Sequence, residues 1–255
     1  MSSKRTSAAE RAALLVGVAL VGWLVWRSRG WPLVHDAPLM HYVAWCMGQG
    51  LVPYRDVFDM NFPGAYLLHW AVLSTVGPGD VAWRVFDLGW LALTGALLAA
   101  LAAPWGPTPA LGAALSFALY HLAGGAWQAG QRDFLLCAFL LTGALGVARW
   151  LERAPEGGGR AALAGGGLAL GAAVTIKPHA AALALALGVV LVVTAVRTSG
   201  GVAAPAIFGG TVLVVPIAVV AWLGAAGALP AWRAIVLDYL LPLYSRLGGS
   251  TGWTV

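Results

Sequence analysis

Long apolar runs separated by short polar breaks make up most of this chain. Several reach the roughly 20 residues that a helix needs to cross a bilayer. The runs do not alternate between apolar and polar positions, which favours helices over the strands of a barrel. We therefore predict an all-α polytopic transmembrane bundle of about seven spans: Ala9–Trp26, Val81–Ala103, Pro109–Ala126, Phe134–Leu151, Ala161–Ile176, His179–Val196 and Val202–Gly227.

A polar island, Val34–Gly64, interrupts this pattern after the first run. Within it, Asp36–Met47 has the spacing of a short amphipathic helix. A second short helix is predicted from Pro63, with the apolar core Ala65–Val76. A core of this length is more typical of an interfacial helix than of a span. The segment 27–80 should then be one long extracytoplasmic loop with two juxtamembrane helices.

The rest of the chain completes a single membrane-embedded module, 1–255. Gly167 and Gly171 form a small-xxx-small pair suited to close helix packing. Gly157–Gly159 is predicted to be a loop, and the tail Leu229–Val255 to hold one more interfacial helix.

The composition supports a membrane protein. The chain is 60% hydrophobic and 10% charged, with a mean hydropathy of +0.81, whereas soluble domains are about 25% charged. No small-residue cleavage site follows the first run, so we predict a retained anchor. The net charge of +5 is scattered without a basic patch, which argues against a nucleic-acid partner.

Orientation depends on a few basic residues. With a cytoplasmic N-terminus, the 15 Lys and Arg residues divide into seven inside and eight outside. The short loop with Arg149, Arg153 and Arg160 carries more weight under the positive-inside rule and is expected to be cytoplasmic. Arg27 and Arg29 then lie outside, against that rule.

This topology places most ionisable groups outside the cytoplasmic loops at one extracytoplasmic cavity. Such groups at membrane depth are costly, which makes them candidates for function. Besides the polar island, they are Arg84, Asp87, His121, Arg132, Asp133, Lys177 and His179.

Each candidate also has a structural alternative. Asp36 and Asp133 could each cap the helix that follows. Arg84 and Asp87 could pair across one helical turn, and Lys177 could extend to the interface.

The remaining polar candidates also have two readings. Asp56 and Asp59 could be solvated loop charges. The histidines lack the spacing of a metal site, so structural roles are the alternative for His35, His41, His121 and His179.

Several short motifs stand in and after the polar island: His35–Asp36, Gly50–Leu51–Val52–Pro53–Tyr54–Arg55–Asp56, Pro63–Gly64–Ala65–Tyr66, Gly77 to Arg84, Arg132–Asp133 and Lys177–Pro178. Together they resemble the GT-C superfamily of lipid-dependent glycosyltransferases, in particular the group of protein O-mannosyltransferases and aminoarabinose transferases. The resemblance covers about Ala9–Val196.

The chain departs from that family in two respects. Many members carry paired acidic residues in the first outer loop, whereas Ala37 follows Asp36 here. Members are also usually much longer, so a chain that stops at Val255 would be a fragment, a truncated product or a minimal module.

The resemblance implies an inverting transfer of a sugar from a polyprenyl-phosphate donor to an extracytoplasmic glycan, lipid or protein acceptor, in the bacterial inner membrane. Asp36 would be the catalytic base, with Asp133 as a second carboxylate. A divalent metal ion could assist, with Asp133 and His35 as ligands. Substrate contacts would come from Tyr54, Arg55, Asp56, Arg84, Arg132, Lys177 and His179.

Two other functions remain open. A transporter or flippase would use the same cavity to move a solute, although no inverted repeat is visible and the ionisable groups gather at one face. A non-catalytic subunit of a larger complex would carry the motif residues as relics. The sugar and its acceptor are not specified by the sequence.

Overall fold

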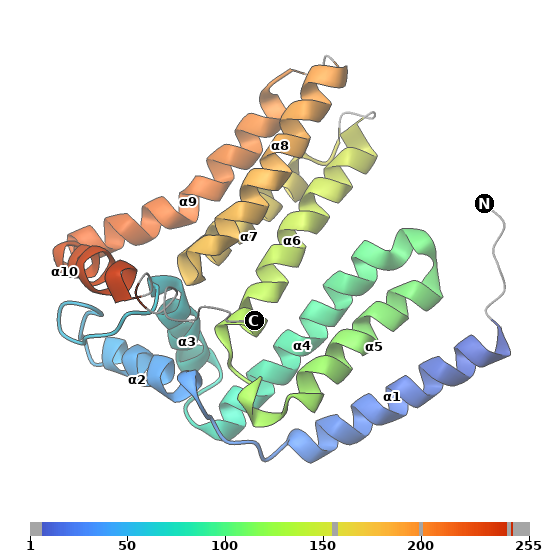
Figure 1. Ribbon diagram of the computed structural model, residues 1–255, viewed down its shortest axis with the longest axis horizontal. Coiled ribbons are helices and arrows are strands. Elements are labelled where there is room, and N and C mark those ends of the chain that lie inside the picture. Colours follow the sequence, from blue (N-terminus) through green and yellow to red (C-terminus); the bar gives the residue numbers. More distant parts are fainter. Residues whose placement is uncertain (1–6, 155–157, 199–200, 244–245, 247–255) are drawn as a thin grey trace.

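The computed structural model describes residues 7–154, 158–198, 201–243 and 246, and within these ranges the chain forms helices and no β-strand (Figure 1). The α-helices are α1 (Ala8–Ser28), α2 (Asp36–Gly48), α3 (Pro63–Thr75), α4 (Asp80–Ala102), α5 (Pro107–Ala123), α6 (Arg132–Arg153), α7 (Arg160–Ile176), α8 (Ala181–Thr198), α9 (Ala203–Ala225) and α10 (Leu229–Ala234). Short helical turns are η1 (Ala103–Trp105), η2 (Gly125–Trp127), η4 (Pro178–Ala180) and η5 (Ile235–Leu240).

Every predicted span coincides with a helix, and the two predicted short helices are α2 and α3. Among the described residues, 5 helices are long and apolar enough to cross a membrane, namely α1, α4 with η1, α6, η4 with α8, and α9. The other two, α5 and α7, have 17 residues each. The predicted all-helical architecture is therefore confirmed for the described residues, and five of these helices are candidate spans by length and composition.

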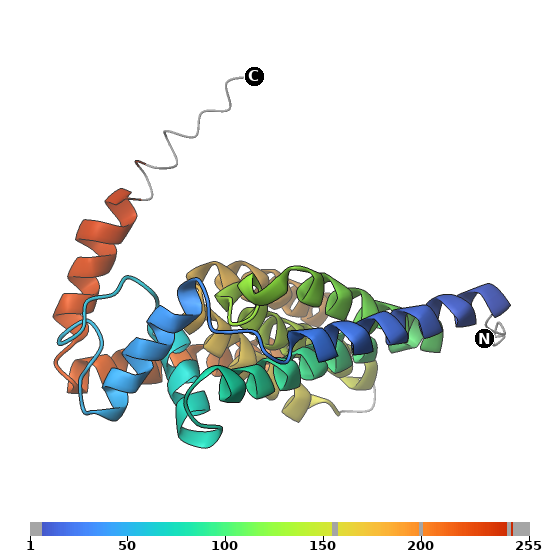
Figure 2. The same ribbon diagram turned by 90° about the horizontal axis from the view of Figure 1, so that it is seen from below.

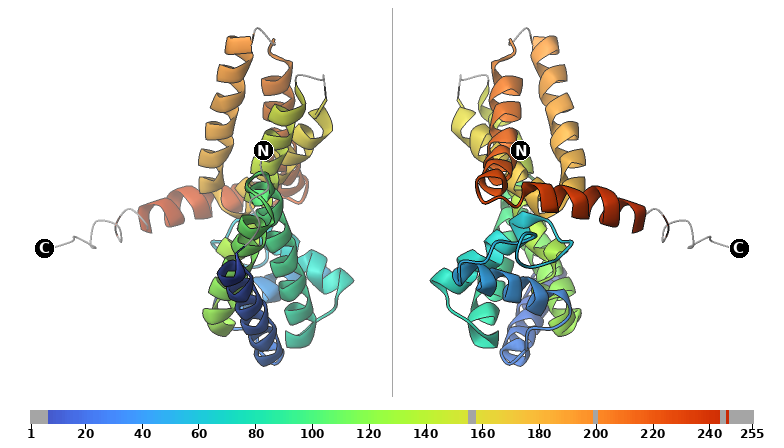
Figure 3. Two further views of the ribbon diagram at one scale, coloured as in Figure 1. Left: turned by 90° about the vertical axis from the view of Figure 1, so that its right-hand side faces the viewer. Right: turned by 90° about the vertical axis from the view of Figure 1, so that its left-hand side faces the viewer.

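The predicted tail helix begins as α10 and continues into η5, which Figures 2 and 3 show running away from the bundle. Residues 247–255 of the predicted tail, and Gly157 of the predicted loop, lie outside the described residues.

The connections between the long helices lie at two opposite ends of the molecule. In Figure 1, η1 and the start of α1 are at one end, together with the ends of α6 and α8. The polar island, α2, α3 and α10 lie at the other, which we call the α2–α3 end. Segments far apart in sequence are thereby brought together at the α2–α3 end.

Helix α7 packs between α6 and α9 because glycines let the backbones approach. A Cβ atom at Gly146 would come within 2.5 Å of the Ala162 carbonyl oxygen. On the other side, a Cβ atom at Gly167 would meet Thr211, and one at Gly171 would lie 2.3 Å from the Val212 oxygen. The predicted small-xxx-small pair thus faces α9.

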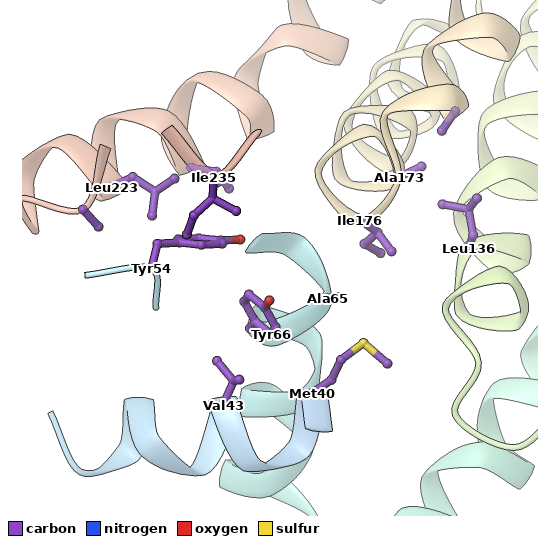
Figure 4. Close-up of a cluster of buried hydrophobic side chains, with 13 residues drawn as sticks. Met40, Val43, Tyr54, Ala65, Tyr66, Leu136, Ala173, Ile176, Leu223 and Ile235 are labelled. Atoms are coloured by element: carbon purple, nitrogen blue, oxygen red, sulfur yellow. The ribbon is translucent and has the colours of Figure 1, made fainter. Parts of the chain in front are cut away.

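A similar close contact fixes the start of α3 against the end of α7. A Cβ atom at Gly64 would lie 2.8 Å from the backbone nitrogen of Ile176. The apolar cluster beside this contact receives side chains from α2, α3, α6, α7, α9 and η5 (Figure 4). This cluster holds the polar island on the ends of the long helices.

Candidate functional site

The carboxylate of Asp36 and the guanidinium of Arg132 meet at the α2–α3 end. Nη2 of Arg132 lies 3.3 Å from Oδ2 of Asp36, and Nη1 donates to the side-chain oxygen of Asn61. The side chains of Asp36 and Arg132 are 35% and 22% exposed. This ion pair is therefore held in place by the polar island and still open to solvent.

Asp36 does not cap α2, so the capping alternative is wrong. The N-cap residue is His35, with φ of 60°, and no side chain bonds to the free N–H groups there. Nδ1 of His35 lies 3.2 Å from Oδ1 of Asp36 and 2.9 Å from Nε2 of Gln131. The Asp36 carboxylate thus contacts side chains from the start of α2 and the start of α6.

Asn61 connects this ion pair to a buried polar group. Its backbone N–H and its side-chain amide donate to Oδ1 of Asp59, at 2.7 and 2.9 Å. The hydroxyl groups of Tyr54 and Tyr66 donate to its carbonyl oxygen, at 2.6 and 3.2 Å. Burial raises the pKa of both tyrosines, so they remain protonated donors. Asp59 is buried, and the prediction of a solvated loop charge is wrong for it.

A second ion pair begins at the next residue of α6. Nζ of Lys177 donates to Oδ1 of Asp133 at 2.5 Å and links α6 to the turn between α7 and η4. The N-cap residue of α6 is Gln131, so Asp133 does not occupy the capping position. Because Arg132 and Asp133 are consecutive, both ion pairs start from the same helical turn.

Arg55 and Asp56 hold the polar island against the end of α9. Arg55 donates to Asp56 through Nε and Nη2, at 3.0 and 2.8 Å, and to the Ala226 carbonyl at 2.7 Å. The Arg55 hydrogen bonds lower the pKa of Asp56, with a smaller effect from the N–H of Val52. Asp56 is therefore engaged in the loop's own structure, and its predicted substrate contact stays a prediction.

Arg84 belongs to a separate buried cluster between α1, α4 and α5. It donates to Asp87 and to the hydroxyl of Ser28, and Nε2 of His121 lies 3.3 Å from the same Asp87 oxygen. The predicted pairing of Arg84 with Asp87 is confirmed. In the described chain, no contact joins this cluster to Asp36, so a role for Arg84 in substrate binding stays a prediction.

The residues predicted as metal ligands do not share one site. Asp133 faces Lys177, while His35 packs on the ring of Trp127, with 3.6 Å between the ring centres. His179 is exposed in η4. Within the described ranges, no three side chains of His, Cys, Asp or Glu come together as a metal site would require.

The buried His69 and the half-buried His41 form a pair that should make stability depend on pH. Their Nδ1 atoms lie 3.4 Å apart, and the His69 ring stacks on Trp83 with 4.2 Å between centres. Burial lowers the pKa of His69 to about 3, with a smaller effect from His41, whose own pKa burial also lowers. Both rings are therefore neutral in the folded protein at neutral pH.

We expect the folded state to lose stability as the pH falls below the ordinary histidine pKa of about 6.5. The unfolded chain then binds protons that the folded chain does not. For His69 alone this amounts to about 2 kcal/mol between pH ~7 and pH ~5. Unfolding followed across this range measures the slope, and His69→Leu should flatten it. An unchanged slope in that variant would show that other groups titrate.

Sequence reasoning missed several residues that build the site. Asn61, Tyr66 and Gln131 were not candidates, although each bonds to a predicted site residue or to its partner. A signal was available for Asn61, because Asp59–Met60–Asn61 is a polar step directly before Phe62–Pro63. Nothing in the sequence marks Gln131 as a neighbour of His35.

Comparisons with protein-family models, with curated proteins and with solved structures found no match to this chain.

Proposed function

We propose that this chain is an integral-membrane glycosyltransferase that moves a sugar from a polyprenyl-phosphate donor to an extracytoplasmic acceptor. The observation that carries the proposal is the solvent-open pairing of Asp36 with Arg132, on the same turn of α6 that carries the Asp133–Lys177 pair. Two carboxylates and two cations at the end of a membrane bundle provide a base and phosphate-binding groups in one place.

The Asp36–Arg132 contact suggests how donor binding prepares the base. A donor phosphate would compete with Asp36 for the arginine, which can bind phosphate through two N–H groups. Asn61 would keep hold of Nη1, so the arginine would turn only slightly. The freed carboxylate of Asp36 could then take the acceptor proton as the acceptor atom bonds to the anomeric carbon of the sugar and the bond from that carbon to the phosphate oxygen breaks. Arg132 and Lys177 would stabilise the charge on the leaving phosphate.

An apolar pocket offers room for part of the lipid tail. It has a volume of about 280 Å³ and is lined by residues of the polar island, α2, α3 and α9, including Met47, Trp70 and Trp222. Asp36 and Met47 stand at opposite ends of one stretch of α2, about 16 Å apart by helix geometry. The reacting group and the tail would therefore lie at different ends of α2.

The proposed topology has seven spans, with α5 and α7 crossing as shorter helices and the α2–α3 end outside. The arrangement of connections in Figure 1 supports it, since successive long helices run in opposite directions. We further propose the bacterial inner membrane as the location. The expected metal ligands do not converge, so no step is assigned to a metal ion.

The proposal is tested with the purified full chain and a panel of polyprenyl-phosphate sugars and acceptors. Release of the lipid phosphate together with a glycosylated acceptor is the expected result. A folded protein that binds the donors and releases no lipid phosphate with any acceptor would contradict it.

Transport is the second candidate, because the Arg84–Asp87–His121 cluster is buried between α1, α4 and α5. Ionisable groups buried inside a helical membrane bundle can mark a transport path, although this cluster lies near one end of the bundle. Uptake of a labelled solute into liposomes, without release of lipid phosphate, would favour this function.

A further inference from the structure

Asn61 links a buried carboxylate to the guanidinium of Arg132. Its side-chain nitrogen donates to Oδ1 of Asp59, and its side-chain oxygen accepts from Nη1 of Arg132. Asn61 and Asp59 are both buried. A carboxylate can only accept and a guanidinium can only donate, so turning the amide over would set two acceptors and two donors against each other. The side chain of Asn61 therefore has one fixed orientation.

The backbone of Asn61 is held as firmly as its side chain. Its N–H donates to the same Asp59 oxygen at 2.7 Å, and its carbonyl oxygen accepts from the hydroxyls of Tyr54 and Tyr66. These partners lie in the polar island and in α3, and Asp36 is not one of them. The contact between Asn61 and Arg132 therefore does not depend on the pairing of Arg132 with Asp36.

One edge of the Arg132 guanidinium is left for another group. Nε is buried and has no partner in the described chain, and a buried N–H without a partner is costly. Nη2 meets Asp36 at 3.3 Å, which is long for a charged pair. Nε and Nη2 share one edge of the planar guanidinium, and two oxygens of a phosphate match such an edge.

We propose that Asn61, held by Asp59, is the positioning residue of Arg132 and keeps its Nε–Nη2 edge available to the phosphate of the sugar donor. The inference rests on the proposed function for the identity of this ligand. One phosphate oxygen takes the place of Asp36 on Nη2 and a second oxygen accepts from Nε, while Asn61 stays on Nη1. The arginine is oriented before the donor arrives, so less conformational freedom is lost on binding.

The first test measures the dissociation constant of a polyprenyl phosphate on the purified full chain. Asn61→Leu keeps the approximate size of the side chain and removes its contact with Arg132. We expect binding to weaken about tenfold or more, the usual effect of losing a hydrogen bond to a charged group. A misfolded fraction would lower the number of binding sites and leave the dissociation constant unchanged, which separates positioning from a structural role.

The matched control is Gln49→Leu, which removes an exposed amide from the same polar island. It should bind the polyprenyl phosphate as the wild type does. Wild-type affinity in Asn61→Leu, or an equal loss in Gln49→Leu, would overturn the proposal.

A second measurement needs no variant of Asn61. This residue is the only asparagine in the chain, so labelling asparagine with ¹⁵N at its side chain gives one amide group to follow by NMR. We expect this amide to exchange its hydrogens slowly, and equally slowly in Asp36→Asn, because Asp36 does not hold it. Fast exchange in the wild type, or exchange that quickens in Asp36→Asn, would overturn the proposal.

The positioning role and the transferase activity fail in different ways. Phosphate binding that depends on Asn61, in a chain that transfers no sugar, would contradict the transferase and support the positioning role. Sugar transfer with unchanged donor affinity in Asn61→Leu would support the transferase and overturn the positioning role. A wild-type chain that binds no polyprenyl phosphate would contradict both.

Discussion

Replacing Asp36 with asparagine should lower the rate of sugar transfer by a factor of about 10² to 10⁴, the usual contribution of a general base. The amide cannot accept the acceptor proton, while its size and its contact with Arg132 are nearly preserved. The ion pair is partly exposed, and such pairs contribute about 0–1 kcal/mol to stability. The thermal midpoint and the membrane insertion should therefore stay close to those of the wild type.

The control is Asp238→Asn, which removes an exposed carboxylate at the same end of the molecule. It should transfer sugar at the wild-type rate. Asp36→Glu should recover part of the activity, because it restores a carboxylate at a displaced position. Full activity of Asp36→Asn in the release assay would exclude Asp36 as the base, even if the protein proves to be a transferase.

Gly171→Leu should destabilise the bundle by about 3 kcal/mol or more. A Cβ atom at this position would lie 2.3 Å from the Val212 carbonyl oxygen, and the larger side chain would force α7 and α9 apart. Because backbone atoms are involved, no side-chain rotation can relieve the contact. Unfolding in mixed micelles with increasing SDS measures the change.

Gly165→Leu is the matched control on the same helix. A Cβ atom at Gly165 meets nothing within 4 Å, and the residue is exposed. This variant should unfold within about 0.5 kcal/mol of the wild type. Equal losses in both variants would indicate that leucine disturbs α7 itself, and that close packing against α9 is not the cause.

Helix positions were predictable from the sequence because hydropathy and helix-breaking residues act locally. The first helix illustrates this: Ser7 and Glu10 form a reciprocal capping pair, with Glu10 N donating to the Ser7 hydroxyl at 3.1 Å and Ser7 N to the Glu10 carboxylate at 2.7 Å. Such signals lie within a few residues of each other. The number of membrane crossings depends in addition on the bilayer, so the 17-residue helices α5 and α7 leave it open.

The site was predictable only in part, because its partners are far apart in the chain. Asp36 and Arg132 are separated by 96 positions, and the sequence could indicate only that both lie at one end of the bundle. The pairing of Asp36 with Arg132 depends on the close packing of Gly130 between Ala37 and Trp83. A Cβ atom there would lie 2.7 Å from Cβ of Ala37. Contacts of this kind have no local signature.

Asp59 shows why burial was hard to foresee. Its loop has no helical or strand period, so nothing indicated which side chains turn inward. Its partner Asn61 accepts hydrogen bonds from Tyr54 and Tyr66, and Tyr66 follows Gly64, which packs on the end of α7. The sequence therefore indicated that Asp59, an acidic residue in a polar loop, is solvated. In the fold its carboxylate instead accepts the hydrogen bonds that hold Asn61 in place.

The two ion pairs at the α2–α3 end are open to solvent, so their strength should depend on ionic strength. The Debye length falls from about 10 Å at 0.1 M salt to about 3 Å at 1 M. Concentrated buffers should therefore loosen Asp36 from Arg132 and Asp133 from Lys177, while the enclosed Arg84–Asp87 pair is affected far less. Preparations kept at different ionic strengths can thus differ at the α2–α3 end while their bundles remain the same.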